Sequence, residues 1–191
     1  MRPRNHEPSE RRVYLRRPSL GDAAEHRALC RASRALHRGK VSPPFAPEAF
    51  ADYVARCQSP DFDGSFVCLR ASGAIVGVFN LSQIFLKNFR SAYLGYYAAA
   101  PYARLGLMAE GLELVLRRAF LTLRLHRVEA NLQPSNRASR ALVRRAGFRL
   151  EGFSPRYLKI AGRYRDHERW ALTVEDYERR RRAATPSTAK L

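Results

Sequence analysis

The sequence predicts an α/β protein in which a mixed, mostly antiparallel sheet is flanked by helices. Its 191 residues are 46% apolar, which suits a single domain that buries its own core. Segments with strand-like and helix-like patterns alternate, so both kinds of element should share one layered structure. Near the middle of the chain, three strand-like segments follow one another without a helix between them. Because consecutive strands joined by short turns pair antiparallel, a doubly wound parallel sheet is disfavoured.

The first half of the chain should form four strands and two helices. A strand at 13–15 ends before Pro18, since proline cannot continue a ladder, and Asp22 is the expected N-cap of a helix at 23–36. Gly73 marks a hairpin between two later strands, because glycine accepts a positive φ. The remaining elements, predicted from the spacing of apolar residues, are a helix at 48–57 and strands at 66–70, 75–84 and 91–98.

The second half begins with the clearest helix of the chain, in which Met108, Leu112 and Val115 recur at helical spacing. Gly147 ends the next helix, and Gly162 marks the turn of a second hairpin. The expected elements are a helix at 107–121, a strand at 127–132, a helix at 137–146, strands at 157–160 and 164–172, and a helix at 174–182.

The chain is strongly basic. Lysine and arginine total 35 against 17 aspartate and glutamate residues, which gives a formal net charge of +18. This charge favours a polyanionic partner, such as RNA or a ribosome, or an acidic cofactor, with a solvated basic surface as the alternative. The cysteines, Cys30, Cys57 and Cys68, are odd in number and lack paired spacing, so they indicate neither a disulfide framework nor a zinc site. A reducing compartment and no metal are therefore expected.

The first 12 residues are polar and charged, and they lack the apolar run that a signal peptide or membrane span needs. We therefore expect a cytoplasmic protein without a membrane partner. The predicted organisation is a flexible basic segment at 1–12, one domain at 13–182 and a disordered tail at 183–191.

The first chemical signal lies between the strand at 91–98 and the helix at 107–121. A turn centred on Gly106 leads from the strand straight into the helix, so unpaired backbone N–H groups at the helix start face whatever lies beyond the strand. Such a turn suits a pyrophosphate, and ordinary turn chemistry is the alternative.

A second signal consists of VEAN at 128–131, PSNRAS at 134–139 and AGFRLEG at 146–152. In this order the two signals resemble the GCN-five-related N-acetyltransferase (GNAT) superfamily. Within it, the chain is similar to the RimJ/RimL branch of ribosomal-protein-alanine N-acetyltransferases. The resemblance extends over 77–171 and includes NLS at 80–82, YLGY at 93–96, GLM at 106–108 and RDH at 165–167. It implies that 13–182 is a GNAT-like N-acetyltransferase domain with acetyl-coenzyme A (acetyl-CoA) as cosubstrate.

The resemblance also assigns a coenzyme site. In the superfamily a splayed strand offers a backbone N–H to the acetyl oxygen, a glycine-bearing turn holds the pyrophosphate, and an Asn-x-x-Ser helix lies along the pantetheine. The family usually has Gln or Arg three residues before the turn glycine. This chain has Ala103 there, so Arg104 is the expected source of charge from a shifted position. The implied coenzyme residues are Tyr96, Tyr97, Ala98, Arg104, Leu105, Gly106, Leu107, Met108, Ala109, Asn136 and Ser139.

Two residues are expected to move the protons that amide formation requires. Glu129 matches the general-base glutamate of some relatives and should act through water, with a surface glutamate paired to Arg127 or Arg149 as the alternative. Ser139 should lie near the sulfur and protonate the leaving thiolate, because Val143 occupies the place of the tyrosine that many relatives use. The alternative for Ser139 is a helix serine bonded back to a carbonyl.

Other polar residues are interpreted as structural. His167 follows Asp166 within a strand and is expected to pack rather than to catalyse. Arg137, Arg140 and Arg144 share one face of the helix at 137–146, which is most simply its solvated side. The alternative is that Arg137 or Arg140 binds the coenzyme phosphates.

These features predict an acetyl-coenzyme A-dependent N-acetyltransferase whose foremost acceptor is the N-terminal α-amine of a ribosomal protein. Two alternatives stay open. One is an enzyme for a small amine, such as an antibiotic or a polyamine, and the other is a catalytically silent GNAT-fold module that binds the ribosome or RNA. The basic composition argues against a cationic small substrate, because like charges repel.

Overall fold

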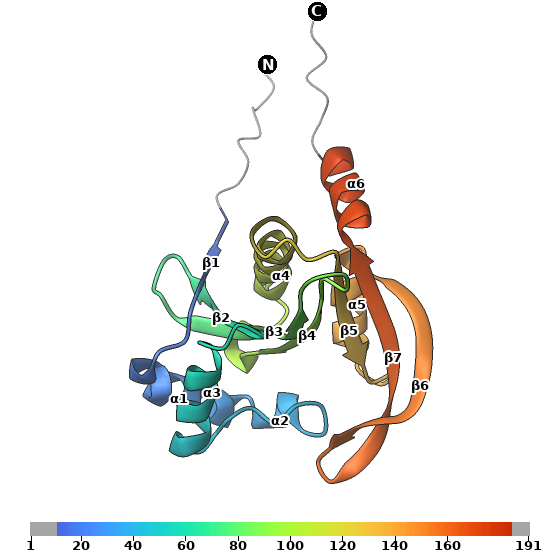
Figure 1. Ribbon diagram of the computed structural model, residues 1–191. Helices are drawn as coiled ribbons and strands as arrows, with labels where there is room; N and C mark the ends of the chain where they lie inside the picture. Colours follow the sequence, from blue (N-terminus) through green and yellow to red (C-terminus); the bar gives the residue numbers. More distant parts are fainter. Residues whose placement is uncertain (1–10, 185–191) are drawn as a thin grey trace, which may run out of the picture.

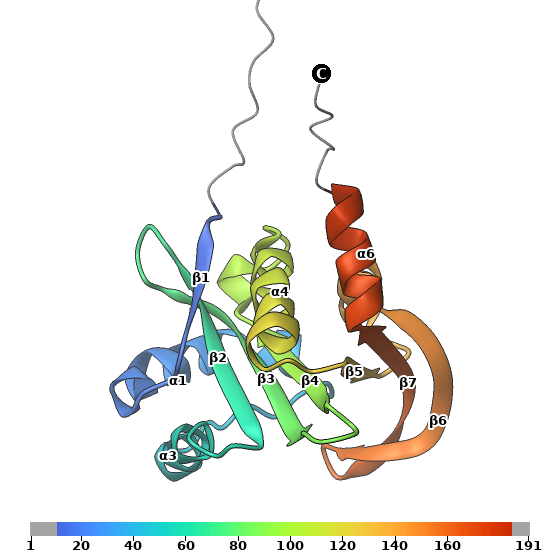
Figure 2. The same cartoon turned by 45° about the horizontal axis from the view of Figure 1, so that its top comes forward.

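In the computed structural model, which describes residues 11–184, one seven-stranded sheet carries helices on both faces (Figures 1 and 2). The strand order is β1-β2-β3-β4-β5-β7-β6, and every neighbouring pair is antiparallel except β4 with β5. The prediction of an α/β domain with a mixed, mostly antiparallel sheet is therefore confirmed, as are both hairpins. The strands are β1(Val13–Arg16), β2(Phe62–Leu69), β3(Ile75–Phe85), β4(Ser91–Ala98), β5(Arg127–Leu132), β6(Arg149–Ile160) and β7(Arg163–Thr173).

The helices divide between the two faces of the sheet. On one face lie α1(Ala23–Ala32), α2(Arg34–His37) and α3(Pro47–Arg56), and on the other lie α4(Leu107–Arg117), α5(Arg137–Arg145) and α6(Val174–Ala184) (Figure 1). The remaining helical elements within 11–184 are the short turns η1(Leu20–Asp22) and η2(Ala100–Tyr102) and the π-helical η3(Arg118–Thr122). Each face has its own apolar core, with Leu112, Phe120 and Tyr177 in one and Phe50 and Phe66 in the other. The result is a three-layer α/β/α structure.

Helix α4 lies very close to the sheet because glycines stand at the contact. A Cβ atom added at Gly111 would lie 2.8 Å from Val67 Cγ2, and one added at Gly77 would overlap Met108 Sδ. Neither contact leaves room for a side chain. This approach fixes the start of α4 against the end of β4.

The helix expected at 23–36 is broken at Ser33, whose buried hydroxyl accepts a hydrogen bond from the Ala100 N–H at 2.9 Å. Asp22 precedes α1, but its carboxylate does not cap it. Instead, Asp22 accepts bonds from the Ser19 N–H at 2.7 Å and from Arg16 at 2.7 and 2.8 Å. The long-range bond of Ser33 and the competing local bonds of Asp22 thus override the expected helix pattern.

Strand β6 begins at Arg149, well before the strand expected at 157–160. Its register with β7 shifts between Leu150 and Gly152 and again between Ser154 and Leu158. The edge position tolerates such irregularity, because the outer N–H groups need no ladder partner. The shifts break the two-residue period on which a prediction from sequence depends.

Other boundaries also move. β2 begins at Phe62 rather than at 66, and α4 gives way to the π turn at Arg118, whose guanidinium pairs with the buried Asp63 of β2. α6 continues to Ala184, beyond the expected domain end at 182. Residues 1–10 and 185–191 lie outside the described part, so the flexible segment and the disordered tail predicted there stay predictions. None of the helices within 11–184 has the length and apolar character needed to cross a membrane.

Replacing Gly111 by valine should lower the free energy of unfolding by about 1–3 kcal/mol, because the added methyl groups would overlap Val67 in a close-packed core. Urea denaturation measures the loss. Arg117→Val is the matched control, since it places the same β-branched residue on an exposed position of the same helix. If both variants lost the same free energy of unfolding, the contact between α4 and the sheet could accommodate a larger side chain at Gly111.

Candidate active site

Strands β4 and β5 lie side by side only at their start. Their parallel pairing is limited to Ser91–Tyr93 with Arg127–Glu129, whereas β4 continues along β3 to Ala98 and β5 continues along β7 to Leu132. The two strands therefore separate after Tyr93 and Glu129. We call the opening between their ends the β4–β5 splay.

Alternate peptide groups of β4 point into this splay. The Ala99 N–H donates to Val76 O at 2.9 Å, which pairs this residue with β3. Along an antiparallel strand, the peptide groups of alternate residues point to opposite sides. Since Ala99 points its N–H toward β3, Tyr96 and Ala98 point theirs toward the splay. The hydrogen bond from His37 Nε2 to Ala98 O, at 2.9 Å, agrees with this direction. The splay thus presents backbone donors to a ligand oxygen.

The turn that follows β4 has the backbone of an anion site. Gly106 has a φ of 80°, a left-handed conformation that favours glycine, and α4 starts at the next residue. Hydrogen bonding within the helix begins with the Ala109 N–H donating to Gly106 O at 3.0 Å. The N–H groups of Leu107 and Met108 therefore have no acceptor inside the helix, and the helix dipole adds partial positive charge.

The side chains of the predicted turn residues point in different directions. Leu107 is buried in the core and Met108 packs over Gly77, so both can meet a ligand only through their backbone. Leu105 and Arg104 are exposed, and Arg104 has no hydrogen-bond or ion-pair partner among residues 11–184. The anion site is therefore built mainly from backbone groups.

Tyr97, another predicted coenzyme residue, faces away from the splay. Its hydroxyl lies 2.9 Å from His26 Nε2 in the core beneath α1, and burial raises the pKa of Tyr97 well above its ordinary value. Burial also lowers the pKa of His26 to about 4, so this imidazole is neutral at pH 7. Tyr97 thus supports β4 from the side of α1.

Helix α5 borders the splay on the opposite face of the sheet. Asn136 is its N-cap, and the Asn136 Oδ1 accepts a hydrogen bond from the Ser139 N–H at 3.3 Å. The hydroxyl of Tyr96 donates to Ser139 O at 3.3 Å, which joins β4 to α5. Burial raises the pKa of Tyr96 to about 12, so its phenol stays protonated at pH 7. Val143 is buried in the core, as its apolar side chain requires.

Glu129 stands where the two strands separate, in register with Tyr93. Its carboxylate accepts a hydrogen bond from Arg127 Nε at 2.8 Å, and its side chain is 18% exposed. Arg127 also pairs with Glu151, whereas Arg149 pairs with Asp176. Glu129 therefore has both the position expected of a base and the ion pair named as its alternative.

A hollow of about 340 Å³ opens at the splay on the face that carries α1–α3. Tyr93 and Gly95 share this face with Tyr97, because side chains two residues apart lie on one side of a strand. The long β6–β7 hairpin curves toward the same face (Figures 1 and 2). Among residues 11–184, no charged side chain lines the hollow, which is formed by Ser82, Gln83, Tyr93, Leu94, Gly95, Asn131, Tyr157 and Leu158.

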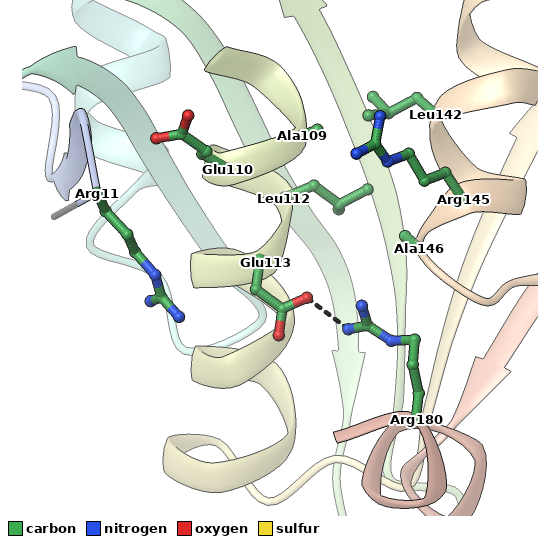
Figure 3. Close-up of a pocket in the computed structure, with 9 residues that line it drawn as sticks. All are labelled: Arg11, Ala109, Glu110, Leu112, Glu113, Leu142, Arg145, Ala146 and Arg180. Carbon is green, nitrogen blue, oxygen red and sulfur yellow. Dashed lines mark hydrogen bonds and ion pairs between the residues drawn. The ribbon is translucent and has the colours of Figure 1, made fainter. Parts of the chain in front are cut away.

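A second hollow, of about 270 Å³, lies between α4 and α5 on the other face (Figure 3). Figure 3 shows Glu113 of α4 reaching across to Arg180 of α6, with which it forms an ion pair. Arg11 and Arg145 have no ion-pair partner in the described part of the chain, so their charge is available to an anion. The lining consists of Arg11, Ala109, Glu110, Leu112, Glu113, Leu142, Arg145, Ala146 and Arg180.

The arginine stripe of α5 lies on the far side of that helix from α4. Arg137, Arg140 and Arg144 line a separate hollow with Trp170 of β7, and Arg140 Nε donates to Glu168 Oε2 at 2.9 Å. The stripe is therefore directed toward β7 and away from the splay. His167 is also a packing residue, as expected, because it is buried against Tyr157.

Three polar contacts near the site could not be predicted from the sequence. Ser33 and His37 hydrogen-bond the chain at the end of β4, and Arg12 Nη2 donates to Leu105 O at 2.8 Å. Each joins segments far apart in the chain, so no local spacing marks it. Among residues 11–184, no group of three or more His, Cys, Asp or Glu side chains is arranged to hold a metal ion.

The sequence matches the acetyltransferase (GNAT) domain family over residues 12–149. The protein therefore belongs to this family, and the resemblance seen in its motifs is confirmed. Across 103 residues it is 40% identical to the [ribosomal protein uS5]-alanine N-acetyltransferase of Escherichia coli K12, which covers 54% of this chain and 53% of that protein. The chain thus spans about half the length of the curated relatives it matches.

Solved structures share the fold over most of the chain. Mycobacterium smegmatis RimJ, in complex with CoA-disulfide, superimposes with a TM-score of 0.80 at 26% identity, covering 90% of this chain and 89% of that one. The spermidine N-acetyltransferase SpeG of Vibrio cholerae gives a TM-score of 0.74 at 22% identity, covering 89% and 98%. At this identity the second likeness concerns the fold alone.

Proposed function

We propose that the protein transfers the acetyl group of acetyl-coenzyme A to the N-terminal α-amine of a protein, foremost a ribosomal protein. The observation that carries this proposal is the β4–β5 splay ending at the turn into α4. The splay directs the N–H groups of Tyr96 and Ala98 inward, and the turn adds the N–H groups of Leu107 and Met108. One ligand with a carbonyl group and a diphosphate would use both sets of donors.

Residues of this chain would bind the coenzyme along the splay. The left-handed Gly106 lets the backbone approach a diphosphate, and Asn136 stands at the start of α5 beside the same opening. Arg145, which has no ion-pair partner among residues 11–184, lines the same hollow as Ala109 (Figure 3). Bound acetyl-coenzyme A would supply a thioester that a neutral amine can attack.

The protein's part in the chemistry is to stabilise charge and to move protons. The N–H groups of Tyr96 and Ala98 would stabilise the negative charge that develops on the acyl oxygen. In this proposal Glu129 takes a proton from the acceptor ammonium through water, and the neutral amine attacks the thioester carbon. As the C–S bond breaks, the Ser139 hydroxyl gives a proton to the departing thiolate and regains the one that the attacking nitrogen loses. The register of Glu129 with Tyr93 and the link from Tyr96 to Ser139 support these roles, because they bring both residues to the splay.

The uncharged hollow on the α1–α3 face supports a protein N-terminus over a polyamine as acceptor. A polycation requires several carboxylates for recognition, and none lines this hollow. The nearby Glu129 and Glu151 both pair with Arg127. The similarity to the uS5-alanine N-acetyltransferase supports a ribosomal acceptor, and the net charge of +18 suits a ribosome as partner. The proposal implies a cytoplasmic location, where ribosomal proteins are made.

Gly106→Ala should weaken coenzyme A binding on the order of tenfold, because a side chain at the turn crowds the diphosphate. Isothermal calorimetry measures the affinity. Gly162→Ala is the matched control, since Gly162 has the same φ of 80° but lies in the β6–β7 turn. Both variants should lose similar stability from backbone strain, and only Gly106→Ala should lose affinity. Unchanged binding in Gly106→Ala would remove the turn from the coenzyme site.

Glu129→Gln and Ser139→Ala should each lower turnover on the order of tenfold to a thousandfold while leaving coenzyme affinity nearly intact. The reason is that both changes remove a proton carrier and keep the shape of the site. Steady-state kinetics across pH measure the effect. Glu151→Gln is the control, because it removes the other carboxylate paired with Arg127. A full rate for Glu129→Gln at every pH would make Glu129 a surface residue.

Two peptides of equal sequence test the acceptor, one with a free N-terminus and blocked lysines, the other with the reverse. We expect transfer to the free N-terminus, because an α-amine has a reference pKa near ~8 against ~10.4 for lysine, so more of it is neutral at pH 7. Mass spectrometry locates the acetyl group.

Transfer to the lysine peptide alone, or to spermidine but neither peptide, would overturn the α-amine assignment. RNA binding that weakens steeply with salt, without transfer to any acceptor, would favour the silent RNA-binding module instead. Intact ribosomal proteins serve as further acceptors in the same assay.

A further inference from the structure

We infer that Arg12 is a coenzyme-binding residue whose guanidinium contacts the diphosphate at the turn into α4. The inference rests on the proposed function, since it concerns the same ligand. Arg12 lies just before β1. The turn residue with which it forms a hydrogen bond, Leu105, is 93 residues further along the chain. It belongs to neither the glycine turn nor the Asn-x-x-Ser helix.

The guanidinium of Arg12 is held directly beside the turn. Its Nη2 donates to Leu105 O at 2.8 Å, and a Cβ atom built on Gly106 would lie 3.4 Å from the same nitrogen. The unpaired N–H groups of Leu107 and Met108 directly follow Gly106 in the chain. A diphosphate bound to these N–H groups would therefore lie within reach of the Arg12 side chain.

Glu110 orients the arginine by three contacts, one of which is an ion pair between Glu110 Oε1 and Arg12 Nη2 at 2.5 Å. The carboxylate accepts from the Arg12 backbone N–H at 2.9 Å through Oε2 and from Arg12 Nε at 2.7 Å through Oε1. These bonds fix the plane of the guanidinium before any ligand arrives, so binding costs less side-chain entropy. Nη1 has no partner among the described residues, and the side chain remains 55% exposed. Donors are therefore left for a phosphate oxygen.

The same contacts compensate for the unusual turn sequence. Ala103 places no polar side chain three residues before the glycine, and Arg104 is exposed without a fixed contact among residues 11–184. An arginine anchored at both Leu105 and Glu110 places its charge more exactly than one that moves freely in solvent. Arg12, rather than Arg104, is thus the main cation of the turn.

Glu110 allows a phosphate-binding role of Arg12 to be distinguished from a structural one. Its negative charge stands beside the anion site and is neutralised by Arg12. Arg12→Ala would remove a cation and also leave Glu110 facing the phosphates. Adding Glu110→Gln to that variant should therefore restore part of the lost affinity, whereas an arginine with a merely structural role would not be rescued in this way.

The test is calorimetry of coenzyme A and of 3′-dephospho-coenzyme A with wild type and variants. Arg12→Ala should bind both ligands about tenfold or more weakly, because a charge-assisted phosphate contact is lost. The double variant Arg12→Ala/Glu110→Gln should recover part of the loss. Arg17→Ala, which removes an exposed arginine bonded to Gln58 on the same segment, should bind like wild type. Thermal unfolding checks that each variant folds.

S-acetyl-pantetheine, a donor without phosphates, separates contact from packing. Its kcat/KM should be the same in wild type and Arg12→Ala, and an equal loss with this donor would reduce Arg12 to a packing role. A loss confined to coenzyme A, with dephospho-coenzyme A unaffected, would move Arg12 to the 3′-phosphate and overturn the diphosphate contact. Unchanged binding in Arg12→Ala would overturn this inference alone, whereas a wild type that binds no coenzyme would overturn the proposed function with it.

Discussion

The main constraint on the structure is that β4 and β5 separate in the middle of the sheet and leave backbone groups without a ladder partner. An unpaired backbone group in a buried sheet costs about 1–3 kcal/mol, so the separating ends of β4 and β5 need other partners. His37 donates to Ala98 O, and Ser33 accepts from the Ala100 N–H. Just beyond β5, the side chain of Gln133 donates from Nε2 to Gly39 O at 2.8 Å, which links the end of β5 to the segment after α2. The segment around α2 therefore joins both strand ends, and the donors left over are those that face the splay.

This arrangement brings two unlike environments together at one opening. On the α4–α5 face, Arg12 lies beside the turn, and Arg11 and Arg145 lie at the neighbouring hollow, where Glu110 is paired with Arg12 and Glu113 with Arg180. On the α1–α3 face the hollow is lined by uncharged polar and aromatic side chains. An anionic donor and a neutral amine would thus approach from opposite sides of the sheet. The neutral, buried His26 beneath Tyr97 adds no charge to the acceptor side at pH 7.

Local chemistry made part of the site predictable. Gly106 could be recognised because a turn between a strand and a helix favours one residue type, whereas Asn136 was assigned through the Asn-x-x-Ser resemblance and proves to be the N-cap of α5. Both signals lie within a few residues of the feature they create. The ion pair of Glu129 with Arg127 was foreseeable as well, since residues two apart share a face of a strand.

The parts that escaped prediction depend on distant partners. Ser33 breaks a favourable helix for a bond to Ala100, and Arg12 joins a turn that its own neighbours do not indicate. Tyr97 was predicted as a coenzyme residue together with Tyr96 and Ala98, and the fold shows that its side chain lies on the other face of the sheet from theirs, because successive side chains of a strand alternate in direction. Family motifs identify which segments approach the ligand, and only the fold shows which atoms of those segments face it.

The bulged edge strand β6 has a consequence for the behaviour of the protein in a crowded solution. Long, regular edge strands recruit copies of themselves, and β6 exposes large apolar side chains such as Leu150 and Phe153. Its register shifts and Pro155 deny an incoming strand a continuous row of matching donors and acceptors. The opposite edge is the short β1. The hairpin can therefore be long enough to reach over the acceptor face without turning the sheet into a template for aggregation.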